Sequence, residues 1–193
     1  MISKARIKEL YTDKRYQTYF DVGLFAVLIL GIHFIYVPWD KAHYWPITDQ
    51  VMTLFDRASA LLFAQSCRVL NLLNVDITTY KQSIFALNCN NVYSSVTVAP
   101  DCTSLKQWIH WMVLMLAFPG PWKHKAWYIP VGLIIIELTN VIRIVGLLLI
   151  QLPFPNSFHF AHDYIFKTLF YFVIFVMWVV WVEKFVHPKK KNL

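Results

Sequence analysis

The segment AWYIPVGLIIIELTNVIRIVGLLLIQL, residues 126–152, is an almost unbroken run of apolar side chains. A helix needs about 20 apolar residues to cross the hydrocarbon core of a bilayer, so this segment predicts a membrane span. Glu137, Asn140 and Arg143 interrupt it at steps of three, which places them on one face of the helix. Charged side chains inside a span are costly and by default mark a function. We therefore expect an all-α membrane protein with a functional polar stripe, defined here as Glu137, Asn140 and Arg143.

The composition of the whole chain agrees with a membrane protein. Of its 193 residues, 58% are hydrophobic and 15% are charged, whereas a soluble domain carries about 25% charged residues. Aromatic residues make up 17% of the chain, and Trp and Tyr favour membrane interfaces. We expect a single integral-membrane domain over residues 1–193, with a polar, basic N-terminus at residues 1–19 that does not resemble a cleavable signal peptide.

Three more apolar segments predict membrane spans, at residues 20–37, about 105–118 and 160–186. Prolines at their boundaries mark where these helices stop. A fifth segment, residues 51–73, is less apolar and includes the charged or amide side chains Asp56, Arg57, Gln65, Arg68 and Asn71. The sequence thus predicts a bundle of about four to five transmembrane helices.

The distribution of basic residues decides between four and five crossings. Lys and Arg favour the cytoplasmic side of a membrane. Four crossings, with residues 51–73 embedded as an amphipathic helix, place both basic ends (1–19 and 187–193) in the cytoplasm. Five crossings would separate these ends, so we prefer four and expect a multi-pass protein of the cytoplasmic (inner) membrane. Because the net charge of +7 concentrates at the two ends, it suits anionic membrane lipid rather than nucleic acid.

Residues 75–101 predict a small extracytoplasmic β-hairpin. The runs SIFAL and VYSSVTV are rich in strand-forming residues and flank the turn-forming cluster NCNN. The second run leads directly into Pro100, Asp101 and Cys102.

Alternation of the spans brings three residues to one membrane face. Cys102 opens the second span, Arg143 lies in the outer half of the third, and His162 opens the fourth. Consecutive spans run in opposite directions, so all three approach the extracytoplasmic side. A thiol, a guanidinium and an imidazole form a set suited to nucleophilic catalysis, oxyanion stabilisation and proton transfer.

The neighbours of Cys102 bear on whether it is a nucleophile. A cysteine at a helix N-terminus with a cation one turn on, here Lys106, favours the thiolate, while Asp101 opposes it. His110 lies eight residues deeper than Cys102, about 12 Å along a helix. That separation is too large for a general base, so we interpret His110 as packed or cavity-lining. The non-catalytic alternatives are that Cys102 is an inert buried cysteine and that Arg143 forms a structural pair with Glu137.

Two histidines compete for the acid/base role. His159 and His162 both lie at the mouth of the last span. Asp163 follows His162 directly, but adjacent residues of a regular helix do not face each other, so we do not predict Asp163 as its orienting partner.

The order of Cys102 in PDCTSLKQ, Asn140 and Arg143 in NVIRI, and His162 in HDYIF resembles the exosortase/archaeosortase family of integral-membrane cysteine transpeptidases. The resemblance runs from about residue 92 to the C-terminus and suggests a short member. Thr103 and Ser104 stand where the family often has a small residue and Gly.

The resemblance implies that Cys102 attacks a scissile peptide bond, Arg143 stabilises the oxyanion and His162 protonates the leaving amine. Asn140 belongs to the matching N-x-x-R element, and Asp101, Lys106 and His159 are supporting candidates by their positions near Cys102 and His162. It implies exported substrates with a C-terminal hydrophobic helix and a basic tail, an acceptor nucleophile or water, and no cofactor or metal.

Two other function classes stay open on the sequence. Intramembrane histidines such as His33 and His110 could serve a b-haem or quinone protein. The chain could also be a non-catalytic scaffold in which Cys102 is bridged to Cys89. Cys67, Cys89 and Cys102 are an odd set without C-x-x-C spacing, which disfavours a zinc site and a disulfide framework.

Overall fold

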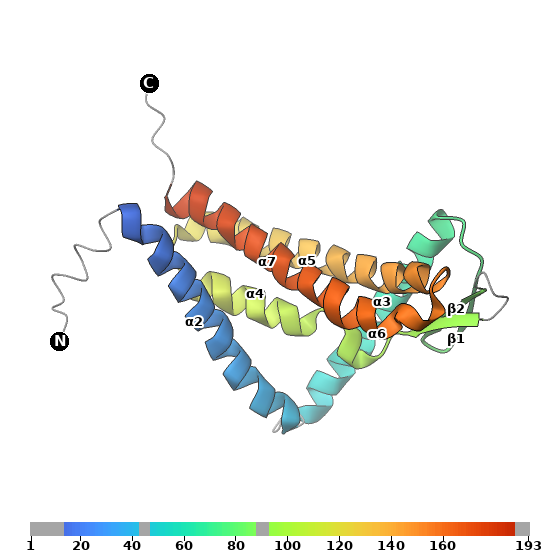
Figure 1. The fold of residues 1–193 in the computed structure, drawn as a ribbon. Helices are drawn as coiled ribbons and strands as arrows, with labels where there is room; N and C mark the ends of the chain where they lie inside the picture. Colours follow the sequence, from blue (N-terminus) through green and yellow to red (C-terminus); the bar gives the residue numbers. More distant parts are fainter. Residues whose placement is uncertain (1–13, 43–46, 88–92, 188–193) are drawn as a thin grey trace.

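The computed structural model describes residues 14–42, 47–87 and 93–187. The basic ends at residues 1–13 and 188–193, and the predicted hairpin turn with Cys89, lie outside the described residues. The chain is mainly helical (Figure 1). Its long helices are α2 (Lys14–Lys41), α3 (Thr48–Leu72), α4 (Leu105–Ala117), α5 (Trp122–Gln151) and α7 (Lys167–Trp181). Short helical turns are η1 (Pro100–Cys102), η2 (Pro155–Ser157), α6 (Phe158–Phe160), η3 (Ala161–Phe166) and η4 (Val182–Val186).

Three helical segments within the described ranges are long and apolar enough to cross a membrane. They are Gln17–Trp39, Trp122–Gln151 and Pro155–Val186. The predicted second span is α4, which has only 13 residues and rises about 20 Å, less than the ~30 Å of a hydrocarbon core. It ends at Ala117 because Pro119 follows closely and the residue before a proline avoids helical geometry.

Helix α3 corresponds to the segment predicted to be amphipathic. It buries Phe55, Ser59, Leu62, Ser66 and Leu70, which recur at steps of four and three along one face. This face packs on α5 and on η1, so α3 helps to position the segment that carries Cys102.

The predicted hairpin is present and is part of a three-stranded antiparallel sheet. Strand β2 (Ser83–Leu87) pairs with β3 (Tyr93–Thr97), and Ser83 lies opposite Thr97. An additional strand, β1 (Ile77–Tyr80), pairs with the other edge of β2. The sequence analysis missed β1 because its four residues are too few for a periodic pattern and three of them are exposed.

The sheet packs against the C-terminal half of α5. Ile84, Val96 and Val98 are buried in the same cluster as Leu147 and Leu148 of α5. A second cluster joins α4, the first half of α5 and α7, with Trp111 and Trp181 fully buried. The long helix α5 therefore links the two clusters and connects the sheet to the opposite end of the bundle.

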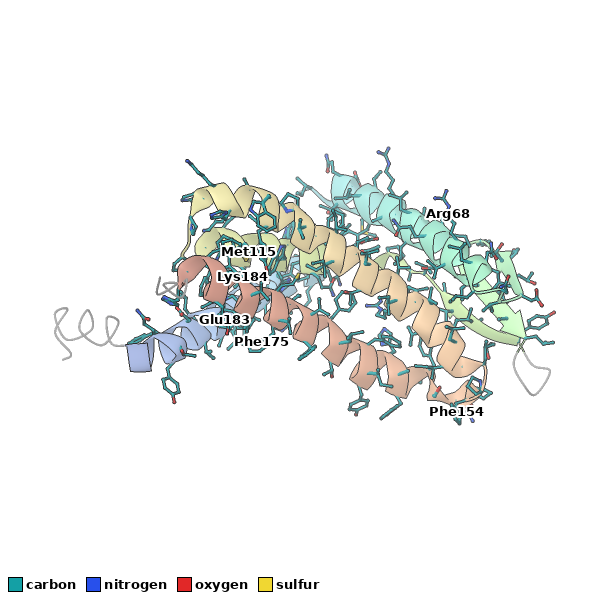
Figure 2. All side chains as sticks on the ribbon, turned by 90° about the horizontal axis from the view of Figure 1, so that it is seen from above. Arg68, Met115, Phe154, Phe175, Glu183 and Lys184 are labelled. Carbon is teal, nitrogen blue, oxygen red and sulfur yellow. The ribbon has the colours of Figure 1, made fainter. Side chains whose placement is uncertain are left out.

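The two described ends of the chain meet at that opposite end. His187 Nε2, just after η4, lies 2.8 Å from Asp21 Oδ2 near the start of α2. Phe154, between α5 and η2, lies at the far end of the molecule from Glu183 and Lys184 (Figure 2). The start of α2 and the end of η4 thus lie on the same side of the bundle.

Candidate active site

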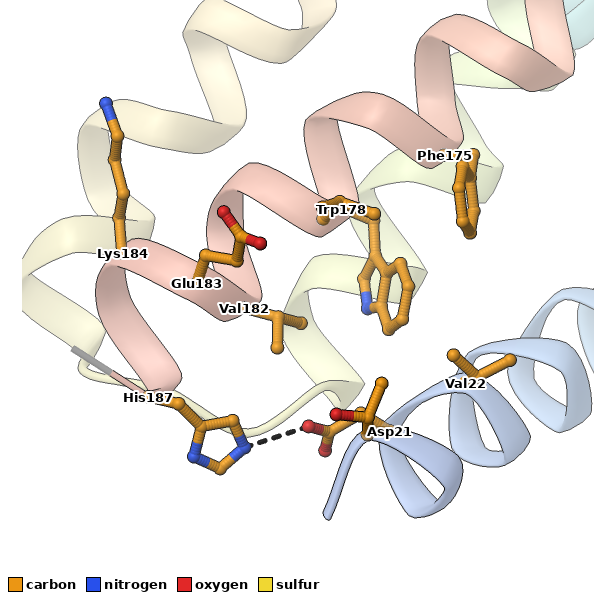
Figure 3. A pocket seen from close by; sticks show the side chains of 10 residues that line it. Asp21, Val22, Phe175, Trp178, Val182, Glu183, Lys184 and His187 are labelled. Atoms are coloured by element: carbon orange, nitrogen blue, oxygen red, sulfur yellow. Dashed lines mark hydrogen bonds and ion pairs between the residues drawn. The ribbon is translucent and has the colours of Figure 1, made fainter. Parts of the chain in front are cut away.

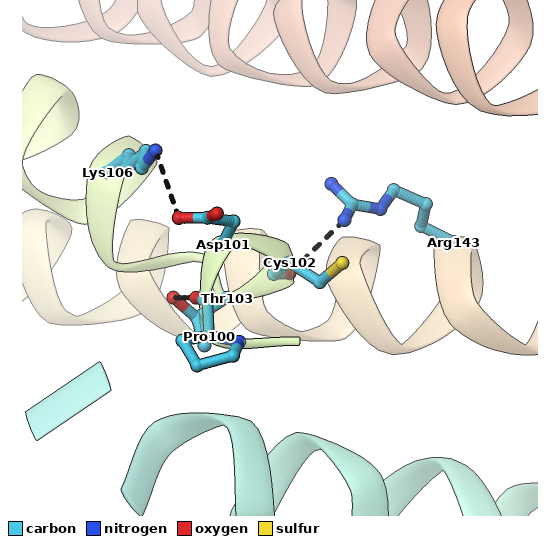
Figure 4. A network of polar contacts seen from close by, with 6 residues as sticks. All are labelled: Pro100, Asp101, Cys102, Thr103, Lys106 and Arg143. Carbon is cyan, nitrogen blue, oxygen red and sulfur yellow. Dashed lines mark hydrogen bonds and ion pairs between the residues drawn. The ribbon is translucent and has the colours of Figure 1, made fainter. Parts of the chain in front are cut away.

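Helix α5 holds the segment of Cys102 through its polar stripe. The Cys102 carbonyl oxygen accepts hydrogen bonds from Asn140 Nδ2 at 3.0 Å and from Arg143 Nη2 at 3.2 Å. The Arg143 side chain also interacts with the free thiol of Cys102, and Figure 4 shows the two groups pointing toward each other. The two residues are 41 positions apart in the chain, and the fold brings them into contact.

The third residue of the stripe holds the same loop. The Ser104 hydroxyl donates a hydrogen bond to the Glu137 carboxylate. No ion pair joins Glu137 to Arg143 in the part of the chain that the structure describes, so the structural pairing considered above is not formed. Spacing by three along α5 presents all three side chains to residues 102–104.

The segment that carries Cys102 meets α5 well before the end of that helix. The contacting residue Arg143 lies eight positions before the end of α5 at Gln151, about 12 Å along the helix. Cys102 ends η1, and α4 begins only at Leu105, after the buried residues Thr103 and Ser104. The nucleophile candidate is therefore the last residue of a short helical turn that precedes α4, rather than the first residue of a span.

His162 lies in the same region but does not touch the thiol. Ala161 and Phe166 of η3 are in the same packed cluster as Cys102, which places η3 beside the site. The His162 ring stacks on Phe158, and its Nδ1 lies 2.9 Å from Asp163 Oδ1. No hydrogen bond joins His162 to Cys102 within the described residues.

The His162–Asp163 contact differs from the sequence-based expectation. Residues 161–166 form a π-helical turn, which is wider than the regular helix on which that expectation rested. Short π-helical turns occur often at functional sites. Sequence reasoning therefore missed Asp163 as a partner of His162, and His159 is exposed on the adjoining turn, next to Phe158.

A family model described as transmembrane exosortase matches residues 19–180. The chain belongs to the transmembrane exosortase family. No match was found among curated proteins or among solved structures. The match covers the whole of Trp122–Gln151. It also covers Gln17–Trp39 and Pro155–Val186 except for residues 17–18 and 181–186.

In this member of the family, Lys106 and Asp101 pair with each other. Lys106 Nζ lies 3.7 Å from Asp101 Oδ1 and 5.8 Å from the centre of the Tyr36 ring. Figure 4 shows this pair on the other side of the loop from the thiol. The cation in contact with the thiol is Arg143, from a different helix.

The deeper histidines line a separate cavity. His110 Nδ1 lies 2.7 Å from the Lys106 carbonyl oxygen, and His110 and His33 both border a cavity of about 220 Å³ between α2, α4 and α7. Ligand pockets usually measure about 300–1,000 Å³, so this space is small for a haem. Among residues 14–42, 47–87 and 93–187, no three His, Cys, Asp or Glu side chains gather as metal ligands.

A larger cavity, of about 630 Å³, lies at the opposite end of the molecule. It is bordered by Phe175, Trp178 and the Asp21–His187 pair (Figure 3). Because it lies among the ends of α2 and η4, it is remote from Cys102 and contributes nothing to the candidate active site.

Proposed function

We propose that this exosortase-family protein is a membrane-embedded cysteine peptidase or transpeptidase that processes the C-terminal sorting signal of exported proteins. The observation that supports it most is the free Cys102 thiol held against Arg143 by the polar stripe of α5. The family match supports the same class of chemistry. The proposed substrates carry a C-terminal hydrophobic helix followed by a basic tail.

The proposed reaction is acyl transfer in two steps. The Cys102 thiolate attacks the scissile carbonyl carbon, a carbon–sulfur bond forms, and the carbon–nitrogen bond breaks as His162 gives a proton to the leaving amine. An acceptor nucleophile or water then attacks the thioester, loses a proton to the base form of His162, and releases the thiolate.

Arg143 is suited to stabilise the oxyanion in both steps. A guanidinium has five N–H donors, and Nη2 alone is engaged with the Cys102 carbonyl oxygen. Its buried Nε has no hydrogen-bond partner among the described atoms. A fixed donor in a low-dielectric site stabilises developing negative charge more strongly than water does.

The proposed topology has four crossings, with both chain ends in the cytoplasm. In this topology α4 does not need to cross the whole hydrocarbon core, because the Cys102 segment that precedes it already lies below the membrane surface. The ~12 Å from Gln151 to Arg143 and the ~20 Å of α4 sum to about the ~30 Å of the hydrocarbon core. The sheet and the site would then face the extracytoplasmic side, with α3 embedded beside them.

The deciding experiment uses a reporter that consists of an exported domain, a hydrophobic helix and a Lys/Arg tail. Cells expressing the wild type are expected to release or transfer the domain, seen as a size change on gels. Cys102→Ala and Cys102→Ser should abolish it, because no other group replaces the thiolate. Cys67→Ala is the matched control and should retain processing.

Thiol labelling places the same residue relative to the membrane. An impermeant maleimide added to spheroplasts is expected to label Cys102. Burial raises the pKa of the Cys67 thiol, so Cys67 stays protonated and slow to react at neutral pH. Processing by Cys102→Ala, or labelling of Cys102 only after the membrane is broken, would refute the proposal.

A further inference from the structure

A small cavity lies behind the loop of Cys102, between α3, α4 and α5. Its volume is about 120 Å³, and it is bordered by Gln65, Trp108, Glu137 and Asn140 together with the loop residues Thr103 and Ser104. Three of the bordering residues each have a buried side-chain atom without a hydrogen-bond partner in the part of the chain that the structure describes: Gln65 Oε1, Trp108 Nε1 and Asn140 Oδ1. Buried polar atoms without partners are costly and rare, so the cavity needs a polar occupant.

The hydrogen-bonding groups without partners are ones that water molecules can satisfy. Trp108 Nε1 can only donate a hydrogen bond, while the two amide oxygens can only accept one. A cation would leave the donor unmet, whereas water both donates and accepts. A water molecule takes up about 30 Å³ of liquid, so the cavity has room for about four.

Water in this cavity would also reach Glu137, whose side chain borders it. The Ser104 hydroxyl donates one hydrogen bond to the Glu137 carboxylate, and cavity water can donate another to that group.

Glu137 does not touch Cys102, yet it holds the residue two positions after it. Asn140 and Arg143 hold the Cys102 carbonyl from one side, and Glu137 holds Ser104 below it. Because the loop is fixed at Cys102 and again at Ser104, the Cys102 thiol is held in one position relative to the Arg143 guanidinium.

We propose that Glu137 is a positioning residue that sets the Cys102 thiol through Ser104, beside a water site in the cavity behind the loop. This inference rests on the proposed function, because it assumes that Cys102 is the nucleophile. The cavity is accordingly a water site and not a subsite for the substrate.

The test measures the rate of Cys102 alkylation by a maleimide in membranes, in a background of Cys67→Ala and Cys89→Ser. Glu137→Ala and Ser104→Ala are each expected to slow alkylation about tenfold, since a hydrogen bond to a charged group contributes about one such factor. The double variant should be no slower than either single variant, because both remove the same contact.

Conservative variants separate positioning from a general loss of structure. Ser104→Thr keeps a hydroxyl and should label at nearly the wild-type rate, while Glu137→Gln keeps a neutral acceptor and should fall between wild type and Glu137→Ala. Wild-type or faster rates in both alanine variants, or losses that multiply in the double variant, would overturn the proposal. If Glu137→Ala fails to accumulate, the Ser104→Ala and Ser104→Thr pair decides alone.

The water site has its own readout. Gln65→Leu adds an apolar side chain of similar size and removes one acceptor. In a wet cavity it should lower the melting temperature, and a higher melting temperature would show a dry cavity instead. Neither measurement needs a substrate, so failure of the proposed processing reaction is distinguishable from failure of this inference.

Discussion

Arg143 is the single residue that the geometry constrains most tightly. It is only partly buried as a side chain, yet its Nε is enclosed and its Nη2 is committed to the Cys102 carbonyl. Its guanidinium also lies 5.7 Å from the Phe170 ring of α7. Contacts from two other parts of the chain therefore fix the position of the cation beside the thiol.

We expect Arg143→Ala to lower reporter processing by about 10²–10³-fold, the usual cost of removing an oxyanion donor. Arg143→Lys should also lose most activity, because a lysine keeps the charge but not the planar fork of donors. The rate of reporter cleavage in membranes measures both. Arg68→Ala, on the exposed side of α3 (Figure 2), is the matched control and should process normally. If Arg68→Ala lost as much processing as Arg143→Ala at normal protein levels, the role of Arg143 would be contradicted.

Two residue pairs show what pattern reasoning could and could not find. The step of three from Asn140 to Arg143 is visible in the sequence, and both residues hold Cys102 in the structure. The Ser104–Glu137 bond was not foreseen because its partners are 33 positions apart. Asp163 was dismissed on regular-helix geometry, which the π-helical turn at residues 161–166 does not follow.

At the level of elements, η3 approaches α5 closely because α5 has a glycine where they meet. A Cβ atom built on Gly146 would lie 2.5 Å from Cζ of Phe166, well inside normal contact. The turn that carries His162 is thus seated against α5 by the absence of a side chain.

Gly146→Ala should push η3 away from α5. We expect a loss of about 1–3 kcal/mol from overpacking, partly offset by the better helix propensity of alanine, together with slower processing as His162 moves. Phe166→Leu combined with Gly146→Ala should recover both, because it removes the colliding ring atom. Melting temperature and reporter cleavage are the measurements. Gly23→Ala on α2, where no atom lies within 4 Å of the added Cβ, is the control and should not destabilise.

Strand β3 has an open edge that leads toward Cys102. The sheet order is β1-β2-β3, and the Val98 amide donates to the Gln82 carbonyl on the β2 side. Because alternate N–H groups point to opposite sides of an antiparallel strand, the Ser95 amide faces the open edge. An extended substrate segment could add there as a fourth strand.

Ser95→Pro is expected to impair processing if the substrate pairs with this edge, because proline removes the edge N–H without removing a ladder bond to β2. Ser95→Ala keeps the N–H and should process like the wild type. Reporter cleavage at limiting substrate, with melting temperature to show that the sheet persists, makes the comparison. Unchanged cleavage in Ser95→Pro would rule out strand addition at β3.

At the scale of the whole molecule, the Asp21–His187 pair shows which ends belong together. The Asp21 side chain is only 3% exposed, and its contact with His187 joins the start of α2 to the end of η4. The sheet and Phe154 lie at the other end (Figure 2). This arrangement agrees with a topology in which both basic ends share one side.

We expect cysteines placed at the two ends of the bundle to label from opposite sides of the membrane. In a background without native cysteines, Thr78→Cys on β1 should react with an impermeant maleimide in intact spheroplasts. Lys184→Cys should react only after the membrane is opened. Both positions are exposed on the protein surface, so a difference in labelling reports the side of the membrane and not burial within the protein. Labelling of both from the same side, or in the reverse order, would contradict the proposed topology.

The amino-acid sequence by itself determined the class of this protein. Long apolar runs at residues 20–37, 126–152 and 160–186 correspond to the three segments able to span a membrane, and alternating strand-forming residues located β2 and β3. These features depend on neighbours within one helix or strand, where the cost of placing polar groups in lipid and the periodicity of side chains are local quantities.

Only the tertiary structure decided how the site is assembled. It placed Cys102 against Asn140 and Arg143 of α5, paired Lys106 with Asp101 and turned the thiol toward the Arg143 guanidinium (Figure 4). Each of these facts follows from contacts between segments that are distant along the chain or from loop geometry. No period of 2 or 3.6 residues records such contacts, because they arise when separate elements pack to bury apolar surface and satisfy buried polar groups.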